Sequence, residues 1–109
     1  MSDEQQPEQA ASEASLALRR AEALVTGDRR SDYGPAAESF AWLAKAWSLT
    51  LEAKLTAPIE PHEVALLMTD LKKRRCLSSP GSMDSWVDGA GYFGLGWECV
   101  VDTVRSRGL

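Results

Sequence analysis

The sequence predicts an all-α protein, a single domain resembling a four-helix bundle. Apolar residues recur at spacings of three, four and seven over several stretches, which is the pattern of helices with one buried face. No segment alternates apolar and polar residues over more than a few positions, as a half-buried β-strand would. The chain has 109 residues, a length that allows one hydrophobic core. We therefore expect one helical domain, which is expected to form oligomers.

The first part of the chain predicts a tail followed by a helix. Residues 1–12 are rich in Asp, Glu, Gln and Ser, a composition typical of a frayed terminus. The helical domain is expected to occupy residues 13–109. Its first helix is predicted at 14–25, where Leu and Ala favour helix formation, and Gly27 is expected to stop it. A loop follows and ends at Pro35, which is suited to open the next helix.

The second helix is predicted at residues 35–55. Its predicted buried stripe consists of Phe40, Leu43, Ala44, Trp47 and Leu51. Trp42 and Leu49 fall on the opposite side of a helix that turns about 100° per residue. Because they would be exposed in a monomer, we interpret them as a second contact surface.

The third helix is predicted at residues 61–76. Pro61 at the first position and Glu63 in the first turn are both favourable at a helix start. The predicted core residues are Val64, Leu67, Met68 and Leu71. The last turn carries the basic run Lys72-Lys73-Arg74-Arg75, which complements the negative end of the helix dipole.

The fourth helix is predicted at residues 83–105, with Ser82 as its cap. Its predicted core residues are Val87, Ala90, Gly94, Trp97 and Val101. The run from Gly89 to Gly94 matches the dinucleotide fingerprint G-x-G-x-x-G, but that motif requires a preceding strand, so we reject this interpretation. Glycines in a helix each cost on the order of 1 kcal/mol relative to Ala. We expect close helix packing, or approach by a ligand, to compensate that cost.

Composition excludes several functional classes. The formal net charge of −4 argues against a protein that coats nucleic acid polymers. No apolar run approaches the roughly 20 residues that span a bilayer, and no secretory signal is visible, so a cytoplasmic location and no membrane partner are expected. Cys76 and Cys99 lack metal or redox spacing, and His62 is the single histidine. Cys/His zinc sites and histidine-dependent nucleophile triads are therefore not expected.

Asp84 and Asp88 are the most informative pair in the sequence. At positions i and i+4 they place two carboxylates on one helix face, shortly after the basic run. One interpretation is a Mg²⁺ site facing a phosphate that Lys72 and Arg75 bind. The alternatives are negative charge placed at a helix start and salt bridges from Lys72 or Arg75 to the two aspartates.

Three further residues are candidates for the same site. Glu38 is a candidate third metal ligand and catalytic carboxylate beside Asp84 and Asp88; alternatively it is a surface acid near a helix start. Arg29 and Tyr33 lie on the predicted loop before Pro35. Arg29 could bind phosphate and Tyr33 could stack on a base, or both could be structural residues of the loop.

The order and spacing of several motifs resemble a phage-encoded helical family. The matching residues are Gly27-Asp28-Arg29, Tyr33-Gly34, Phe40, Ala44, Trp47, Val64 to Met68, Lys72, Arg75, Asp84-Ser85, Val87-Asp88 and Ala90-Gly91-Tyr92. This family is akin to the group named nucleotide modification associated domain 1. The likeness covers about residues 22–98.

That family in turn is distantly similar to the all-α nucleoside triphosphate pyrophosphohydrolases of the MazG and dimeric dUTPase type. Those enzymes bind magnesium through acidic pairs on two helices, spaced by three residues; Asp84 and Asp88 are spaced by four, which departs from that pattern. The resemblance implies a nucleotide-binding protein of phage nucleotide metabolism, with Mg²⁺-dependent hydrolysis of a (deoxy)nucleoside triphosphate as one hypothesis. The second hypothesis is a non-catalytic module that sequesters a nucleotide or docks on a host protein through Trp42 and Leu49.

Overall fold

The computed structural model describes residues 12–27 and 36–108, and these residues form only helices, turns and connecting segments. The helices are α2 (Glu13–Thr26), α4 (Ala36–Thr50), a short 3₁₀ helix η1 (Glu52–Lys54), α5 (Pro61–Ser78) and α6 (Met83–Ser106). No β-strand occurs in the described ranges. The predicted all-α class is confirmed.

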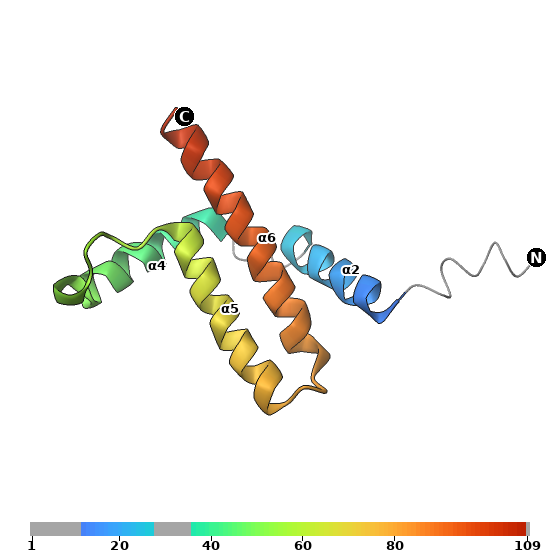
Figure 1. The fold of residues 1–109 in the computed structure, drawn as a ribbon. Coiled ribbons are helices and arrows are strands. Elements are labelled where there is room, and N and C mark those ends of the chain that lie inside the picture. The colour runs from blue at the N-terminus through green and yellow to red at the C-terminus, as the bar shows by residue number, and fades with distance from the viewer. Residues whose placement is uncertain (1–11, 28–35, 109) are drawn as a thin grey trace, which may run out of the picture.

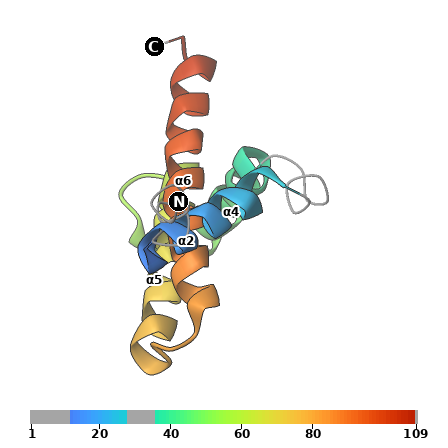
Figure 2. The same ribbon diagram turned by 90° about the vertical axis from the view of Figure 1, so that its right-hand side faces the viewer.

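An antiparallel pair of helices, α5 and α6, forms the centre of the fold and makes its most extensive helix–helix contact (Figure 1). Helix α2 packs against α6, while α4 packs against α5 and, less extensively, against α6. The last turns of α6 extend beyond the first turn of α5 in both views (Figure 2). Because α2 and α4 cover only parts of the pair, long stretches of α5 and α6 keep an open side.

The hydrophobic core is small and lies where α4, α5 and α6 meet. Its buried residues are Phe40, Ala44, Val64, Ala65 and Cys99. Tyr92 packs at its edge, with its ring centroid 6.2 Å from that of Phe40. Two of the five core residues are alanines, so the helices approach closely but bury little side-chain area.

Capping hydrogen bonds and a proline explain where α2 and α5 begin. The Ser15 amide donates to Ser12 Oγ at 3.0 Å, so Ser12 caps α2. Pro61 opens α5 as predicted, and a reciprocal capping box was not anticipated: the Glu60 amide donates to Glu63 Oε1 at 2.8 Å, while the Glu60 side chain accepts from the Glu63 amide.

The second predicted helix ends earlier than expected. Helix α4 stops at Thr50 rather than continuing to residue 55. The connector folds back along it, and the Ile59 amide donates to Ser48 Oγ at 2.8 Å. This hydrogen bond fixes the return path to α5, which a continuing helix would block.

The predicted core faces are confirmed at some positions and wrong at others. Phe40, Ala44, Val64 and Val87 are buried. The wrong assignments are Leu51, Leu67, Leu71, Gly94 and Trp97, all of which are exposed. Helix α6 is packed by α2 on one side and by α5 on the next, so its buried arc runs through Val87, Gly91, Gly96 and Cys99 instead of through Trp97.

Close helix packing explains part of the glycine content of α6. A Cβ built on Gly96 would lie 3.2 Å from Ala65 Cβ, and one built on Gly91 would lie 3.5 Å from Val25 Cγ1. These two glycines let α5 and α2 approach α6. A Cβ on Gly94, in contrast, would meet nothing within 4 Å. The helix cost of Gly94 therefore has no compensation among the described residues.

Candidate functional site at the α5–α6 pair

The charged side of the α5–α6 pair is organised around one ion pair. Lys72 Nζ lies 3.1 Å from Asp88 Oδ2, and these side chains are only 15% and 22% exposed. The antiparallel arrangement brings the second half of α5 beside the first half of α6, as the 3.8 Å approach of Lys72 Cβ to the Cβ position of Gly89 also shows. Partial burial weakens solvent screening, so this pair is expected to contribute about 1 kcal/mol.

The predicted residues Asp84 and Arg75 both lie next to this ion pair on the side of the turn that joins α5 to α6. Asp84 lies one turn before Asp88 on α6, Arg75 lies one turn after Lys72 on α5, and both are exposed. The predicted alternative of a salt bridge to the aspartates is thus confirmed for Lys72 and Asp88. Asp88 is engaged by an ammonium group, while Asp84 and Arg75 remain open to solvent.

The described residues do not assemble the predicted magnesium ligands. Glu38 is exposed in the first turn of α4. Within residues 12–27 and 36–108, no group of three or more His, Cys, Asp or Glu side chains is placed to hold a metal ion. Glu38, Asp84 and Asp88 of one chain therefore do not fit an all-protein Mg²⁺ site, which needs several oxygen ligands converging on the ion.

The candidates on the predicted loop cannot be placed relative to this ion pair. Arg29 and Tyr33 lie outside the described residues, as does all of the predicted tail except Ser12.

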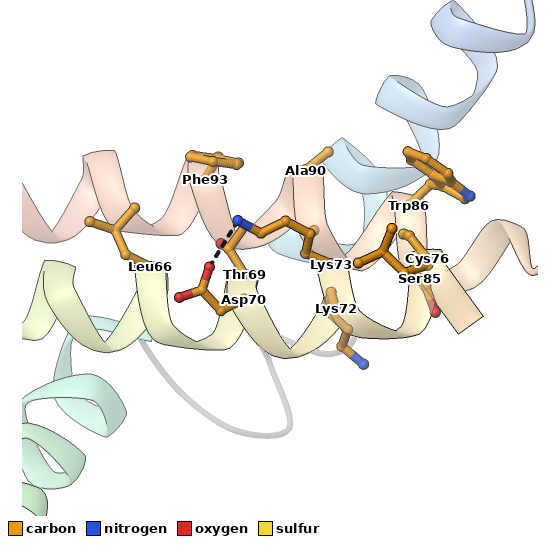
Figure 3. A pocket seen from close by; sticks show the side chains of 12 residues that line it. Leu66, Thr69, Asp70, Lys72, Lys73, Cys76, Ser85, Trp86, Ala90 and Phe93 are labelled. Carbon is orange, nitrogen blue, oxygen red and sulfur yellow. Dashed lines mark ion pairs between the residues drawn. The ribbon is translucent and has the colours of Figure 1, made fainter. Parts of the chain in front are cut away.

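A hollow of about 480 Å³ lies on another side of the pair (Figure 3). Its lining comes from both helices: Leu66, Thr69, Asp70, Lys72, Lys73, Cys76, Leu77, Ser85, Trp86, Gly89, Ala90 and Phe93. Lys73 Nζ pairs with Asp70 Oδ1 at 3.2 Å, and Figure 3 shows the Lys72 amine pointing away from that pair. Neither Asp84 nor Asp88 lines this hollow. Asp88 nevertheless contacts Lys72 at the basic end of α5, and a hollow shared by both aspartates with that end stays a prediction.

The hollow borders an exposed apolar stripe on α6. Trp86, Phe93 and Trp97 are 54%, 60% and 68% exposed. The Trp86 indole nitrogen donates to the Pro80 carbonyl at 2.9 Å, which holds the ring over the turn between α5 and α6. The signal for this stripe was present in the sequence, because Trp86, Ala90, Phe93 and Trp97 follow a spacing of four, three and four.

The two cysteines are free thiols in different environments. Cys99 is buried in the core, and this burial raises the pKa of its thiol, with smaller contributions from the acidic side chains of Glu98 and Asp102. Cys76 is half-buried at the hollow. A raised pKa keeps Cys99 protonated and unreactive, so it serves packing.

Comparison with known sequences places the chain in a family. Residues 16–100 match the domain of unknown function DUF6378. The chain belongs to this family. The Gene 55 protein of Mycobacterium phage L5 is 35% identical over 78 residues, which are 72% of this chain and 48% of that protein. The chain thus spans about half the length of that relative. No solved structure matches the chain.

The phage relative confirms the prediction that the chain is related to phage proteins. The likeness to nucleotide modification associated domain 1 and to the MazG-type enzymes stays a prediction. Within the described residues, no helix is both long and apolar enough to cross a bilayer.

Proposed function

We propose that the protein is a nucleotide-binding helical module that takes a phosphate group at the basic end of α5, in the cytoplasm of a phage-infected cell. The observation that carries this proposal is the Lys72–Asp88 ion pair. Lys72 is held at 15% exposure with its ammonium group 3.1 Å from a carboxylate oxygen. An arriving phosphate oxygen can replace that carboxylate, because both are anionic acceptors of the same ammonium protons.

The neighbouring charges support a phosphate at this place. Arg75 lies one turn along α5 from Lys72 and is exposed, so its guanidinium fork is available for a bidentate contact. Lys72 to Arg75 are four consecutive cations in a chain with a formal net charge of −4. Such a local concentration of positive charge attracts an anionic ligand despite the acidic chain. Arg29 and Tyr33 are proposed as the further phosphate and base contacts.

Hydrolysis of a nucleoside triphosphate, as in the MazG-type enzymes, is the wider form of this proposal. It assigns Asp84, Asp88 and Glu38 to a magnesium ion. Since these residues of one chain do not form a metal-binding group, the binding function is the form that the geometry supports best. Hydrolysis of nucleoside triphosphates in the presence of magnesium would establish this enzymatic function, provided that Asp88→Asn abolishes it.

Calorimetric titration tests the binding function, using the four deoxynucleoside triphosphates and inorganic triphosphate. Lys72→Ala should weaken binding about tenfold, the value of one charge-assisted contact. Lys73→Ala is the matched control, because Lys73 pairs with Asp70 on an exposed surface; its effect should stay below about twofold. Asp88→Asn should strengthen binding several-fold, because it removes the anion that competes for Lys72.

Each outcome has a definite meaning. If Lys72→Ala and Lys73→Ala weaken nucleotide binding equally, the loss reflects only the overall positive charge of this region. That result would contradict a site at Lys72. A loss of binding in Asp88→Asn in the presence of magnesium would favour the metal-dependent form. If none of these ligands binds the unmodified protein, the nucleotide function fails.

A second candidate function is docking on a host protein through α4. Trp42 and Leu49 are 69% and 72% exposed, which confirms their predicted exposure. A hollow of about 580 Å³ lies beside Leu49 and is lined also by Lys45, Ser48, Glu52 and residues 55–59. Trp42→Ala combined with Leu49→Ala, tested for loss of a defined host complex with nucleotide binding retained, would establish this function.

A further inference from the structure

We propose that the apolar stripe of α6 is the surface on which a second copy of this chain docks. The stripe is defined as Trp86, Ala90, Phe93, Gly94, Trp97, Val100 and Val104, with Leu66 and Leu77 of α5 at its border. This inference does not depend on the proposed nucleotide site, because the stripe and the ion pair lie on opposite sides of α6. Trp97 is nine residues from Asp88, which corresponds to about 180° around a helix.

The spacing of the stripe is that of a helix that packs along another helix. Trp86, Ala90, Phe93, Trp97, Val100 and Val104 are separated by four, three, four, three and four residues. This is the alternation of the a and d positions in a seam between two nearly parallel or antiparallel helices. Within the described residues, α2 and α5 pack on other arcs of α6, so the seam has no helix opposite it.

The exposed area fits an interface between proteins. Fully buried aromatic side chains remove about 150–250 Å² each from solvent, so exposures of 54%, 60% and 68% at Trp86, Phe93 and Trp97 leave about 350 Å² of aromatic surface. Leu66 and Leu77, at 47% and 76% exposure, enlarge the patch. The largest apolar patch of an ordinary monomer is about 300–600 Å², and a stable dimer buries about 800 Å² on each partner. The aromatic surface of the stripe thus supplies part of the area that one dimer partner buries, and its border and smaller residues must supply the rest.

The distribution of charge indicates a copy of the same chain as the occupant. The charged residues of α6 are Asp84, Asp88, Glu98, Asp102 and Arg105, and on a helical wheel they all fall within an arc of about 100° that faces away from the stripe. None of the residues of the stripe is charged, and Arg105 lies about 20° from Gly94 at one edge of it. Such a face lets an acidic chain meet its own copy without placing like charges opposite each other, and in a two-fold dimer the same patch serves both partners.

Gly94 provides a separate indication of close approach. It lies midway along the stripe but at its edge, about 60° around the helix from Trp97, and a Cβ there would meet no described atom within 4 Å. Unlike Gly91 and Gly96, it makes no contact that accounts for a glycine in this helix. A second α6 packed on the stripe would use this gap, because the absence of a side chain lets bulky rings of the partner approach the backbone.

Sedimentation velocity of the full chain, from low micromolar to near-millimolar concentration, tests the proposal. We expect a reversible monomer–dimer equilibrium. Trp97→Glu should raise the dimer Kd by about thirtyfold or more, as for an aromatic residue central to an interface. The matched control is Trp42→Glu, because Trp42 is 69% exposed against 68% for Trp97 but lies on α4; it should change Kd by less than about twofold.

A second pair of variants keeps the test independent of the loss of a tryptophan. Gly94→Leu fills the gap in the stripe and should weaken the dimer by about tenfold or more. Gly81→Leu is its control, because Gly81 also has open space around it but lies in the turn before α6. Helical circular dichroism of every variant at low concentration checks that the subunit is folded.

Three results would overturn the proposal. One is an unmodified protein that stays monomeric up to near-millimolar concentration. Another is a dimer that Trp42→Glu dissociates while Trp97→Glu does not. The last is a dimer that Gly94→Leu and Gly81→Leu affect equally. If the protein binds a nucleotide but is strictly monomeric, the dimer proposal is refuted and the proposed function stands.

Discussion

The two sides of α6 differ in how far their side chains are shielded by contacts within the subunit. On one side Asp88 meets Lys72 at 3.1 Å, and both side chains are largely shielded within one chain. On the other side Trp86, Phe93 and Trp97 are more than half exposed. Lys72 and Asp88 thus shield each other within the subunit, whereas these three aromatic rings are mostly left open to solvent. Our two proposals follow this difference: a small anion is the proposed ligand of the charged side, and a second protein surface is the proposed partner of the apolar side.

The largest expected effect distinguishes the two kinds of glycine in α6. Gly96→Leu should destabilise the subunit by about 3 kcal/mol, because even a Cβ there lies 3.2 Å from Ala65 Cβ and a larger side chain must separate α5 from α6. Gly94→Leu should instead stabilise the dilute subunit by up to about 1 kcal/mol through helix propensity. Urea unfolding at low protein concentration measures both. Equal effects would mean that the side with Gly94 is as enclosed as the side with Gly96.

A smaller effect is expected at the ion pair. Asp88→Asn should lower the free energy of unfolding by about 1 kcal/mol, because Lys72 at 15% exposure would lose its carboxylate partner. Asp70→Asn removes the exposed pair with Lys73 and should cost less than about 0.5 kcal/mol. Urea unfolding at low and high salt compares the two. If Asp70→Asn costs as much as Asp88→Asn, the shielding of the Lys72–Asp88 pair has no energetic role.

The smallest effect concerns the core between the two sides and appears only in alkaline solution. Burial raises the pKa of the Cys99 thiol above its ordinary value of 9.0, with smaller contributions from Glu98 and Asp102. The unfolded chain then releases this proton first as the pH rises. Stability is therefore complete below pH 9.0 and falls as the pH rises through the pKa of the folded state. The slope is a fraction of the roughly 1.4 kcal/mol per pH unit available to one group.

Cys99→Ala should remove this alkaline decline, whereas Cys76→Ala should keep it. Unfolding midpoints measured at several alkaline pH values, in the presence of a reductant, give the comparison. An unchanged decline in Cys99→Ala would assign the pH dependence to other groups.

The sequence was sufficient to predict the four helices, although not the end of α4, because proline, glycine and the spacing of apolar residues act locally. Pro61 marks the start of α5 and Gly27 the end of α2, as expected. The orientation of α6 was not predictable in the same way. Its apolar residues cover more than one face, so periodicity did not decide whether Trp97 or Cys99 points to the core. The packing of α4 and α5 against α6 decided it, because Cys99 lies in the core that these three helices share.

The candidate site shows a similar limit. The sequence suggested that Lys72 and Asp88 could meet, because they flank the same turn, and the structure confirms that contact. It could not show whether Glu38 joins them, since this depends on how α4 crosses the α5–α6 pair. The unpartnered Gly94 was also not predictable, because a glycine in a helix gives no sign of which helix, if any, lies opposite.

The hydrogen bond from the Trp86 indole to the Pro80 carbonyl has a consequence for recognition. A freely rotating indole would lose conformational entropy on being covered, and that loss would oppose association. The hydrogen bond to Pro80 already restricts the rotation of the Trp86 side chain within the subunit. Its ring is thus preorganised, which would lower the entropic cost of covering it in the proposed dimer.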